Sequence, residues 1–375
     1  MKTIHNQILT GGGTWCSVLT AIGVMALAGA ASADNIMRLS REFNRPGNIL
    51  IADQFNNRVI EINRDGDIVW SFGRGPTDFT ARSVIGVNDA QRVGTSTLMA
   101  GTGTPAGVIP EAPGGVADNR VMLVDSSGKI LWQYGQFGKA GSGPNLLDTP
   151  VQCTWLPDKD VLITDQANNR IIEVNQARKI VWQYPGSNHN ERDQLNGPNS
   201  AELLANGHVL IADQGNNRAI EVTRGDRIVK TFTVGGTADT VAFASRLKNG
   251  DTLITDAGNS RAVEVDADDK VVWQYFTDTD PMSVPAPLPT QAVRLHNGDT
   301  LISDQFNNRV IRVNLGGAIV ASYGLPLAGG EPIGNNVGYD THTSQDGLYS
   351  PYDAKVVGDY TGLTPPDDSG RGFFQ

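Results

Sequence analysis

The stretch ILIADQFNNRVIEINRDGDIVWSFG, residues 49–73, decides the fold because the chain repeats it. Close copies begin at Val161, Val209, Thr252 and Thr300, and a degenerate copy, NRVMLVDSSGKILWQYG, begins at Asn119. The arginine of each copy stands at 58, 120, 170, 218, 261 and 309, so the spacings are 62, 50, 48, 43 and 48 residues. This period suits a four-stranded propeller blade.

Each copy has the local pattern of short β-strands joined by tight turns. LITD, IIEVN and IVWQY are rich in β-branched residues and alternate roughly between apolar and polar positions. Asn-Gly pairs at 206–207, 249–250 and 297–298 supply the positive φ angles of hairpin turns. One further strand with a small residue precedes each copy. Four strands in each of six units predict an all-β, six-bladed β-propeller of four-stranded antiparallel blades.

The repeated motif resembles a known family. D-x-x-N-N-R-V followed by G-x-I-V-W-x-Y is similar to the NHL repeat of six-bladed β-propellers, and the resemblance covers roughly residues 35–324. It implies the propeller fold. Such propellers serve as binding platforms and also as lyases or lactone hydrolases, so the resemblance does not fix an activity.

The first 33 residues have the organisation of a signal peptide. An apolar run from Trp15 to Ala31 ends in Ala31-Ser32-Ala33, a pattern that signal peptidase cuts, here before Asp34. The run is marginal for a membrane span of roughly 20 residues, and no second apolar run follows. A retained N-terminal anchor is the alternative. We expect a secreted or periplasmic protein with no membrane span after cleavage, and Cys153 as its one remaining cysteine.

The predicted organisation is a signal peptide at 1–33, a propeller at 34–363 with a blade-two insertion at 102–118, and a flexible tail at 364–375. The segment YDAKVV, from Tyr352, matches the strand that precedes each repeat. It either adds a closing strand beside the first blade or packs across the ring. The tail is rich in Pro, Gly and Asp.

Composition excludes some partners. The apolar fraction of 39% indicates a folded chain with a core. Lys and Arg number 30 against 40 Asp and Glu, for a net charge of −10, which argues against binding nucleic acid. We expect a monomer whose partner is a small-molecule ligand or another protein.

The repeats carry an aspartate and an arginine five residues apart. These pairs are Asp53 with Arg58, Asp165 with Arg170, Asp213 with Arg218, Asp256 with Arg261, and Asp304 with Arg309. Five near-identical copies favour a structural role, in which Asp accepts hydrogen bonds from turn amides and Arg makes charge-assisted contacts. Blade two departs from the pattern because Gly101 stands in place of Asp.

The long connections between blades indicate a working face. They span roughly 74–86, 136–150, 185–198, 276–289 and 325–350. In a propeller they emerge on the same face as the blade-two insertion, and we call this the long-loop face. Binding residues often lie on long loops of a rigid scaffold, although surface loops also tolerate insertions without function. The ligand-binding candidates are Asp89, Gln152, Glu111, Asp118, His189, Glu191 and Arg192.

A ring of polar residues is expected at the channel mouth, where the position before each small residue reads Asn35, Asp89, Gln152, Ser200, Phe243, Gln291 and Asp353. Such a ring either holds a cation, Ca²⁺ or Zn²⁺, or lines a water-filled channel. The first case supports the alternative function, a metal-assisted lyase or lactone hydrolase at the channel mouth. Cys153 aligns with alanines, which indicates a packing position and not a nucleophile.

Overall fold

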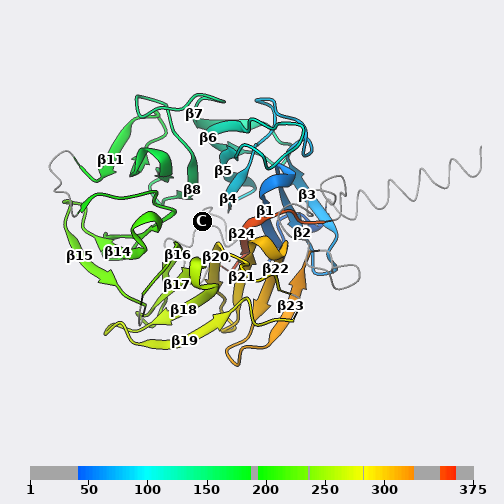
Figure 1. The fold of residues 1–375 in the computed structure, drawn as a ribbon. Helices are drawn as coiled ribbons and strands as arrows, with labels where there is room; N and C mark the ends of the chain where they lie inside the picture. Colours follow the sequence, from blue (N-terminus) through cyan, green and yellow to red (C-terminus); the bar gives the residue numbers. More distant parts are fainter. Residues whose placement is uncertain (1–40, 187–192, 235–236, 282, 325–346, 360–375) are drawn as a thin grey trace, which may run out of the picture. The chain divides into compact units, whose positions relative to one another are not determined.

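The structure is a computed structural model, and it describes residues 41–186, 193–234, 237–281, 283–324 and 347–359 (Figure 1). The chain divides into two units, Met1–Phe43 and Asn44–Gln375, of which the second contains the propeller. The predicted signal peptide, Asn35 and the predicted tail lie outside the described residues. Among the described residues, no helix has the length and apolar character that crossing a membrane requires.

Six four-stranded antiparallel sheets form blades around a common centre, which confirms the predicted fold (Figure 1). The innermost strands are β24 (Pro351–Val356), β4 (Val87–Val93), β8 (Pro150–Trp155), β12 (Ser200–Leu203), β16 (Val241–Arg246) and β20 (Gln291–Arg294). The second strands are β1 (Ile49–Asp53), β5 (Ser96–Thr104), β9 (Val161–Asp165), β13 (Val209–Asp213), β17 (Thr252–Asp256) and β21 (Thr300–Asp304). The third strands are β2 (Arg58–Ile62), β6 (Val116–Val124), β10 (Arg170–Val174), β14 (Arg218–Val222), β18 (Arg261–Val265) and β22 (Arg309–Val313). The outer strands are β3 (Ile68–Phe72), β7 (Ile130–Gly135), β11 (Ile180–Tyr184), β15 (Ile228–Phe232), β19 (Val271–Phe276) and β23 (Ile319–Tyr323).

The C-terminal strand closes the ring. β24 pairs with β1 in antiparallel register, so that Ala354 lies opposite Ile51. The first blade is therefore built from both ends of the propeller, which decides between the two arrangements that the sequence left open. Closure in this way leaves no unpaired inner strand among the six sheets.

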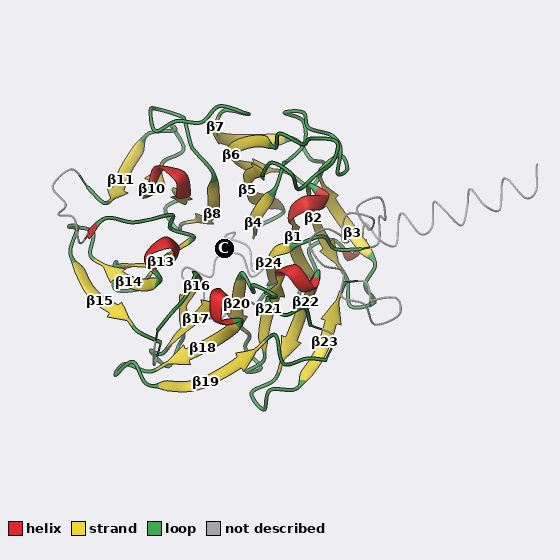
Figure 2. Ribbon diagram, viewed as in Figure 1, coloured by secondary structure: helices red, strands yellow, loops and turns green. Residues whose placement is uncertain are grey.

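The turn that recurs in five of the repeats is a short 3-10 helix between the second and third strands (Figure 2). These helices are η1 (Gln54–Asn56), η2 (Gln166–Asn168), η4 (Gln214–Asn216), η5 (Ala257–Asn259) and η6 (Gln305–Asn307). Each ends on a left-handed residue, which is Asn57 in blade one, with φ of 51°, and Ser260 in blade five. Asn tolerates this conformation better than most residues, which explains the second Asn of the motif.

The core consists of apolar layers between neighbouring blades. Between blades three and four, Trp182 of β11 packs with a cluster that includes Tyr184, Ile220 and Val222. Between blades two and three, Trp132 packs with Val174. The outer-strand tryptophans therefore lie between blades and pack there as apolar side chains.

Candidate functional site

Each repeated Asp–Arg pair forms an ion pair around a buried Asp carboxylate, which we call a clamp. Each Asp is 0% exposed, and its Oδ2 accepts the Nε–H of its Arg at 2.7 to 2.8 Å. The Arg also reaches the connection that enters its own blade, as Arg58 does by donating to the Gly347 carbonyl at 2.7 Å. The first Asn of the motif supports the Asp, as Asn56 does at 2.8 Å. These contacts are of the kind that a structural role requires.

In every blade except blade five, where Ser260 takes its place, the second Asn of the motif joins its blade to the next. The Asn57 side chain accepts the Gly86 backbone N–H at 2.8 Å, and Asn169 accepts that of Gly197 at 2.7 Å. Asn308 accepts the Ser350 backbone N–H at 2.8 Å. The clamps and these links therefore tie the described parts of the long connections to the 3-10 turns on one face. This is the long-loop face.

In blade two the carboxylate comes from a different strand. Asp118 of β6 is 0% exposed and accepts the Nε–H of Arg120 at 2.5 Å and the Ile85 backbone N–H at 2.8 Å. A Cβ atom on Gly101 would lie 2.5 Å from the Asp118 Oδ2 atom. Asp118 thus occupies the space of the missing Asp. We remove it from the ligand-binding candidates because its oxygens are buried and paired.

The insertion itself forms a hairpin that extends β5 and β6. β5 and β6 extend by the pairs Gly103–Ala117 and Thr104–Val116, and residues 105–115 form its tip. The tip is held by backbone hydrogen bonds such as Gly107 N to Pro113 O at 3.0 Å, and by a buried Ile109. Glu111 is exposed on it.

The polar ring exists, but most of its side-chain oxygens already accept hydrogen bonds from the protein. In five of six blades the ring side chain accepts the backbone N–H of the small residue in the next blade. These bonds run from Ala90 to Asp353, from Cys153 to Asp89, from Ala201 to Gln152, from Ala244 to Ser200 and from Ala354 to Gln291, at 2.6 to 3.2 Å. Phe243 interrupts the series. The ring therefore fastens neighbouring inner strands together.

A buried lysine bridges the two carboxylates of this ring. Lys355 Nζ lies 2.6 Å from both Asp89 and Asp353 and 3.0 Å from the Ala90 carbonyl. Burial alone would lower the pKa of Lys355, but the charges of Asp353 and Asp89 outweigh it and raise the pKa. Burial raises the pKa of Asp353. The lysine stays charged at neutral pH, and this ion pair holds blades one and two together.

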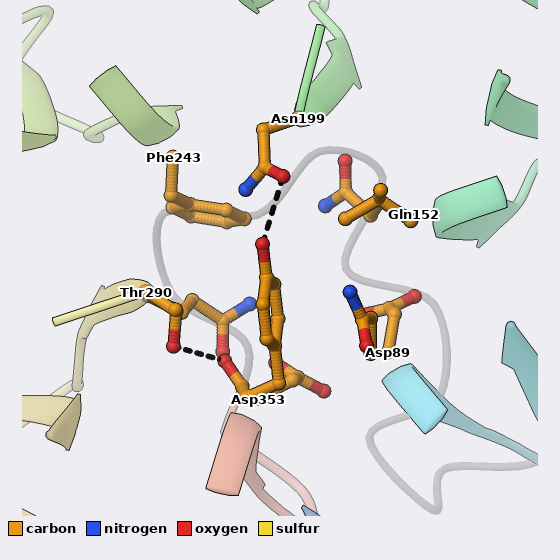
Figure 3. Close-up of a pocket in the computed structure, with 10 residues that line it drawn as sticks. Asp89, Gln152, Asn199, Phe243, Thr290 and Asp353 are labelled. Carbon is orange, nitrogen blue, oxygen red and sulfur yellow. Dashed lines mark hydrogen bonds between the residues drawn. The ribbon is translucent and has the colours of Figure 1, made fainter. Parts of the chain in front are cut away.

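Tyr352 bridges the channel between opposite blades. Its hydroxyl donates to Asn199 at 2.8 Å, and its carbonyl accepts from Thr290 at 2.6 Å (Figure 3). Burial raises the pKa of the phenol to about 12. The cavity left here is about 10 Å³, enough for about one water molecule. The channel at this height is therefore closed to a substrate.

The groups that face this cavity are mostly donors. The side-chain oxygens of Asn88, Gln152 and Gln291 already accept hydrogen bonds, so each amide presents its nitrogen to the space they line. One acceptor, Asp353 Oδ1, is buried without a hydrogen-bond partner. Ca²⁺ and Zn²⁺ need several convergent oxygen or imidazole ligands. The described channel residues do not fit either ion.

One group of carboxylates with metal-ligand spacing lies elsewhere among the described residues. Asp158, Asp160 and Glu173 stand within 4.8 Å of one another. They surround the β8–β9 hairpin turn, on the face opposite to the long loops. Glu173 is already 2.6 Å from the Arg224 guanidinium, so the cluster is partly compensated by the protein itself.

The remaining ligand-binding candidates lie in different parts of the structure. Asp89 and Gln152 lie buried in the channel wall, and Glu111 lies exposed on the hairpin. His189, Glu191 and Arg192 fall outside the described residues. Cys153 is buried, and burial and the Asp89 charge raise the pKa of its thiol well above the usual range, as expected for a packing position.

Two channel residues were missed from the sequence, Lys355 and Tyr352. Both lie on the closing strand, one position either side of the recognised small-residue pattern. The available signal was a charged residue inside the otherwise apolar segment YDAKVV, which indicates a buried partner of opposite charge.

Comparison with known proteins supports the fold. No protein-family model and no curated protein matches the chain. A protein of unknown function from Bacteroides caccae superposes with a TM-score of 0.53 at 15% identity, over 74% of this chain and 93% of that one. Virginiamycin B lyase from Staphylococcus aureus gives a TM-score of 0.49 at 15% identity, over 76% and 82%. At these identities the likeness shows the propeller fold alone.

Proposed function

We propose that this chain is an exported NHL-repeat propeller that binds a ligand or a protein partner through its long-loop face. One observation carries the proposal: the blade-two hairpin lengthens β5 and β6 to nine residues each, against five in the second and third strands of the other blades, on the face where the buried clamps lie. A preformed surface loses little conformational entropy on binding. The alternative enzyme would have its site at the channel mouth, and the Tyr352 bridge leaves a cavity of only about 10 Å³ between the polar-ring residues.

The hairpin tip has the character of a contact surface. Its exposed residues include Pro105, Pro110, Glu111 and Pro113, so it is stiff and mostly uncharged. The proline rings fix φ, and Ile109 anchors the tip from inside. A protein or peptide partner with an apolar patch and a basic residue for Glu111 matches this chemistry.

Photo-crosslinking tests the proposal. A photoreactive amino acid replaces Glu111 on the hairpin or, as a control, exposed Asp268 on the β18–β19 turn of the opposite face. The purified protein is exposed to light in an extract of the producing cells. We expect discrete adducts from position 111 and none from position 268, and excess unmodified chain should compete them away.

A shortened variant completes the experiment. Replacement of residues 105–115 by Asn-Gly joins Thr104 to Val116 through a two-residue hairpin turn. This variant should fail to compete for the adducts. Equal adducts from both positions, or full competition by the shortened variant, would refute binding through the hairpin. N-terminal sequencing of the mature protein, with Asp34 expected first, tests export.

A further inference from the structure

The outer strands of five blades make the same hydrogen bond to the next blade. A long side chain donates to the carbonyl of the second residue in the neighbouring outer turn. These bonds are Trp70 to Ser126 at 3.0 Å, Trp132 to Gln176 at 3.3 Å, Trp182 to Arg224 at 3.1 Å, Lys230 to Ala267 at 2.7 Å, and Trp273 to Leu315 at 3.1 Å. The side chain fills the groove between the two blades.

The sixth junction, between blades six and one, lacks this side chain. Ala321 of β23 stands at the position of the tryptophan, and it faces the groove because Tyr323, two residues on, lines it. The corresponding turn carbonyl belongs to Arg64. Among the described residues, none donates a hydrogen bond to it.

A cavity of about 440 Å³ occupies this junction. Its apolar lining is formed by Ile51, Ile60, Ile62, Ile68, Tyr323 and Leu348. The residues at the matching positions between blades three and four are Ile211, Ile220, Val222, Ile228, Tyr184 and Leu195, and they pack together with Trp182. The lining is therefore an indole-binding environment without its indole.

We propose that this junction binds a small molecule with a flat bicyclic aromatic ring and a ring N–H, that is, an indole. The same fold shows four times that such a ring fits between these side chains. The ring N–H would donate to the Arg64 carbonyl, as the tryptophans do to Ser126 and its equivalents. The volume lies in the range of ligand sites and leaves room for a substituent.

The cavity is reached from the outer rim of the propeller. Gly66, Ser322 and Gly324 belong to its lining and are exposed. Ile51, Ile60 and Ile62, also in the lining, are buried. Asp67 at the rim and the net charge of −10 disfavour an anionic substituent. The ligand class is therefore a neutral or cationic indole. This site is separate from the long-loop face.

Titration with 5-fluoroindole, followed by ¹⁹F NMR on the full chain, tests the proposal. We expect saturable binding at one site. Ala321→Trp places the protein's own indole in the cavity and should weaken binding at least about tenfold while keeping or raising the unfolding temperature. Lys230→Trp adds the same ring at the matching position of blade four and should leave binding unchanged. Ala321→Met, which fills the cavity in part, serves if Ala321→Trp does not fold.

The hydrogen bond has its own test. Competition with 1-methylindole, which has no ring N–H, should show affinity about 2- to 10-fold weaker than indole. Absence of saturable binding up to the solubility limit would overturn the proposal. So would unchanged binding by the folded Ala321 variants, and equal affinity of the two indoles would overturn the role of the Arg64 carbonyl.

Discussion

Moving an aspartate between two strands of blade two provides the sharpest test of the clamp. Gly101 is the cross-strand partner of Arg120, just as Asp53 is of Arg58. The double variant Gly101→Asp/Asp118→Gly therefore rebuilds the arrangement of the other blades. It should be nearly as stable as the natural chain, whereas each single variant should be strongly destabilised.

The magnitudes follow from the contacts. Asp118→Gly leaves Arg120, which is 1% exposed, without its carboxylate, and breaking a buried pair costs about 3–5 kcal/mol. Gly101→Asp puts a Cβ atom 2.5 Å from the Asp118 carboxylate, and overpacking costs about 1–3 kcal/mol before charge repulsion. Additivity would give a loss of about 4–8 kcal/mol for the double variant. We expect a loss of about 1 kcal/mol, so the coupling is several kcal/mol.

The free energy of unfolding, measured in urea for all four proteins, checks this cycle. Asp165→Gly in blade three is the control, because it strands a similarly buried arginine, Arg170, where no second strand offers a carboxylate. It should cost as much as Asp118→Gly. An additive double variant would refute the idea that Asp118 substitutes for the missing Asp, and an undisturbed Gly101→Asp protein would refute the steric part.

Three further outcomes are expected. Cys153 should resist iodoacetamide at pH 8 in the folded chain and react after unfolding, since burial raises its pKa; prompt labelling, located by peptide mass spectrometry, would contradict this. Burial raises the pKa of Asp304 to about 6, and its Oδ1 has no partner. The stabilisation from the protonated Asp304 is fully present below the unfolded pKa near 3.8 and is lost as the pH rises through the folded pKa of about 6. The difference in the free energy of unfolding between the natural chain and Asp304→Asn, measured in urea, should therefore shrink by about 2 kcal/mol from pH 4 to pH 7. A difference that stays constant with pH would contradict this. Tyr352→Phe removes the bond to Asn199 and should cost about 1 kcal/mol in the same assay, with no cost disproving a stabilising bridge.

Most of the fold could be predicted because its determinants are local and repeated. Strand alternation, the Asn-Gly turns and the left-handed Asn of the motif each act within a few residues, and six copies remove the ambiguity of one. The closing strand was different. Its pairing joins Ala354 to Ile51, and no local pattern distinguishes that register from packing across the ring.

The candidate site was predicted less well, for a physical reason. The register correctly placed Asp89 and Gln152 in the channel wall. Whether such oxygens are free depends on how far one inner strand is displaced from the next. Here the displacement brings the Cys153 N–H within 3.0 Å of the Asp89 carboxylate, and this turns a potential ligand into a structural acceptor. The sequence does not directly show this displacement between the inner strands.

Three departures from the repeat differ in whether another residue of the protein replaces the missing side chain. At Gly101 the missing carboxylate is replaced by Asp118, which also occupies the space of the missing side chain. At Lys230 the missing indole is replaced by an amine that makes the same bond to the next turn. At Ala321 no described residue compensates, although the lining side chains and the turn carbonyl are both in place. A groove of this volume costs stability because its lining forfeits van der Waals contacts, so its presence at the closing junction is better explained by an occupant than by packing alone.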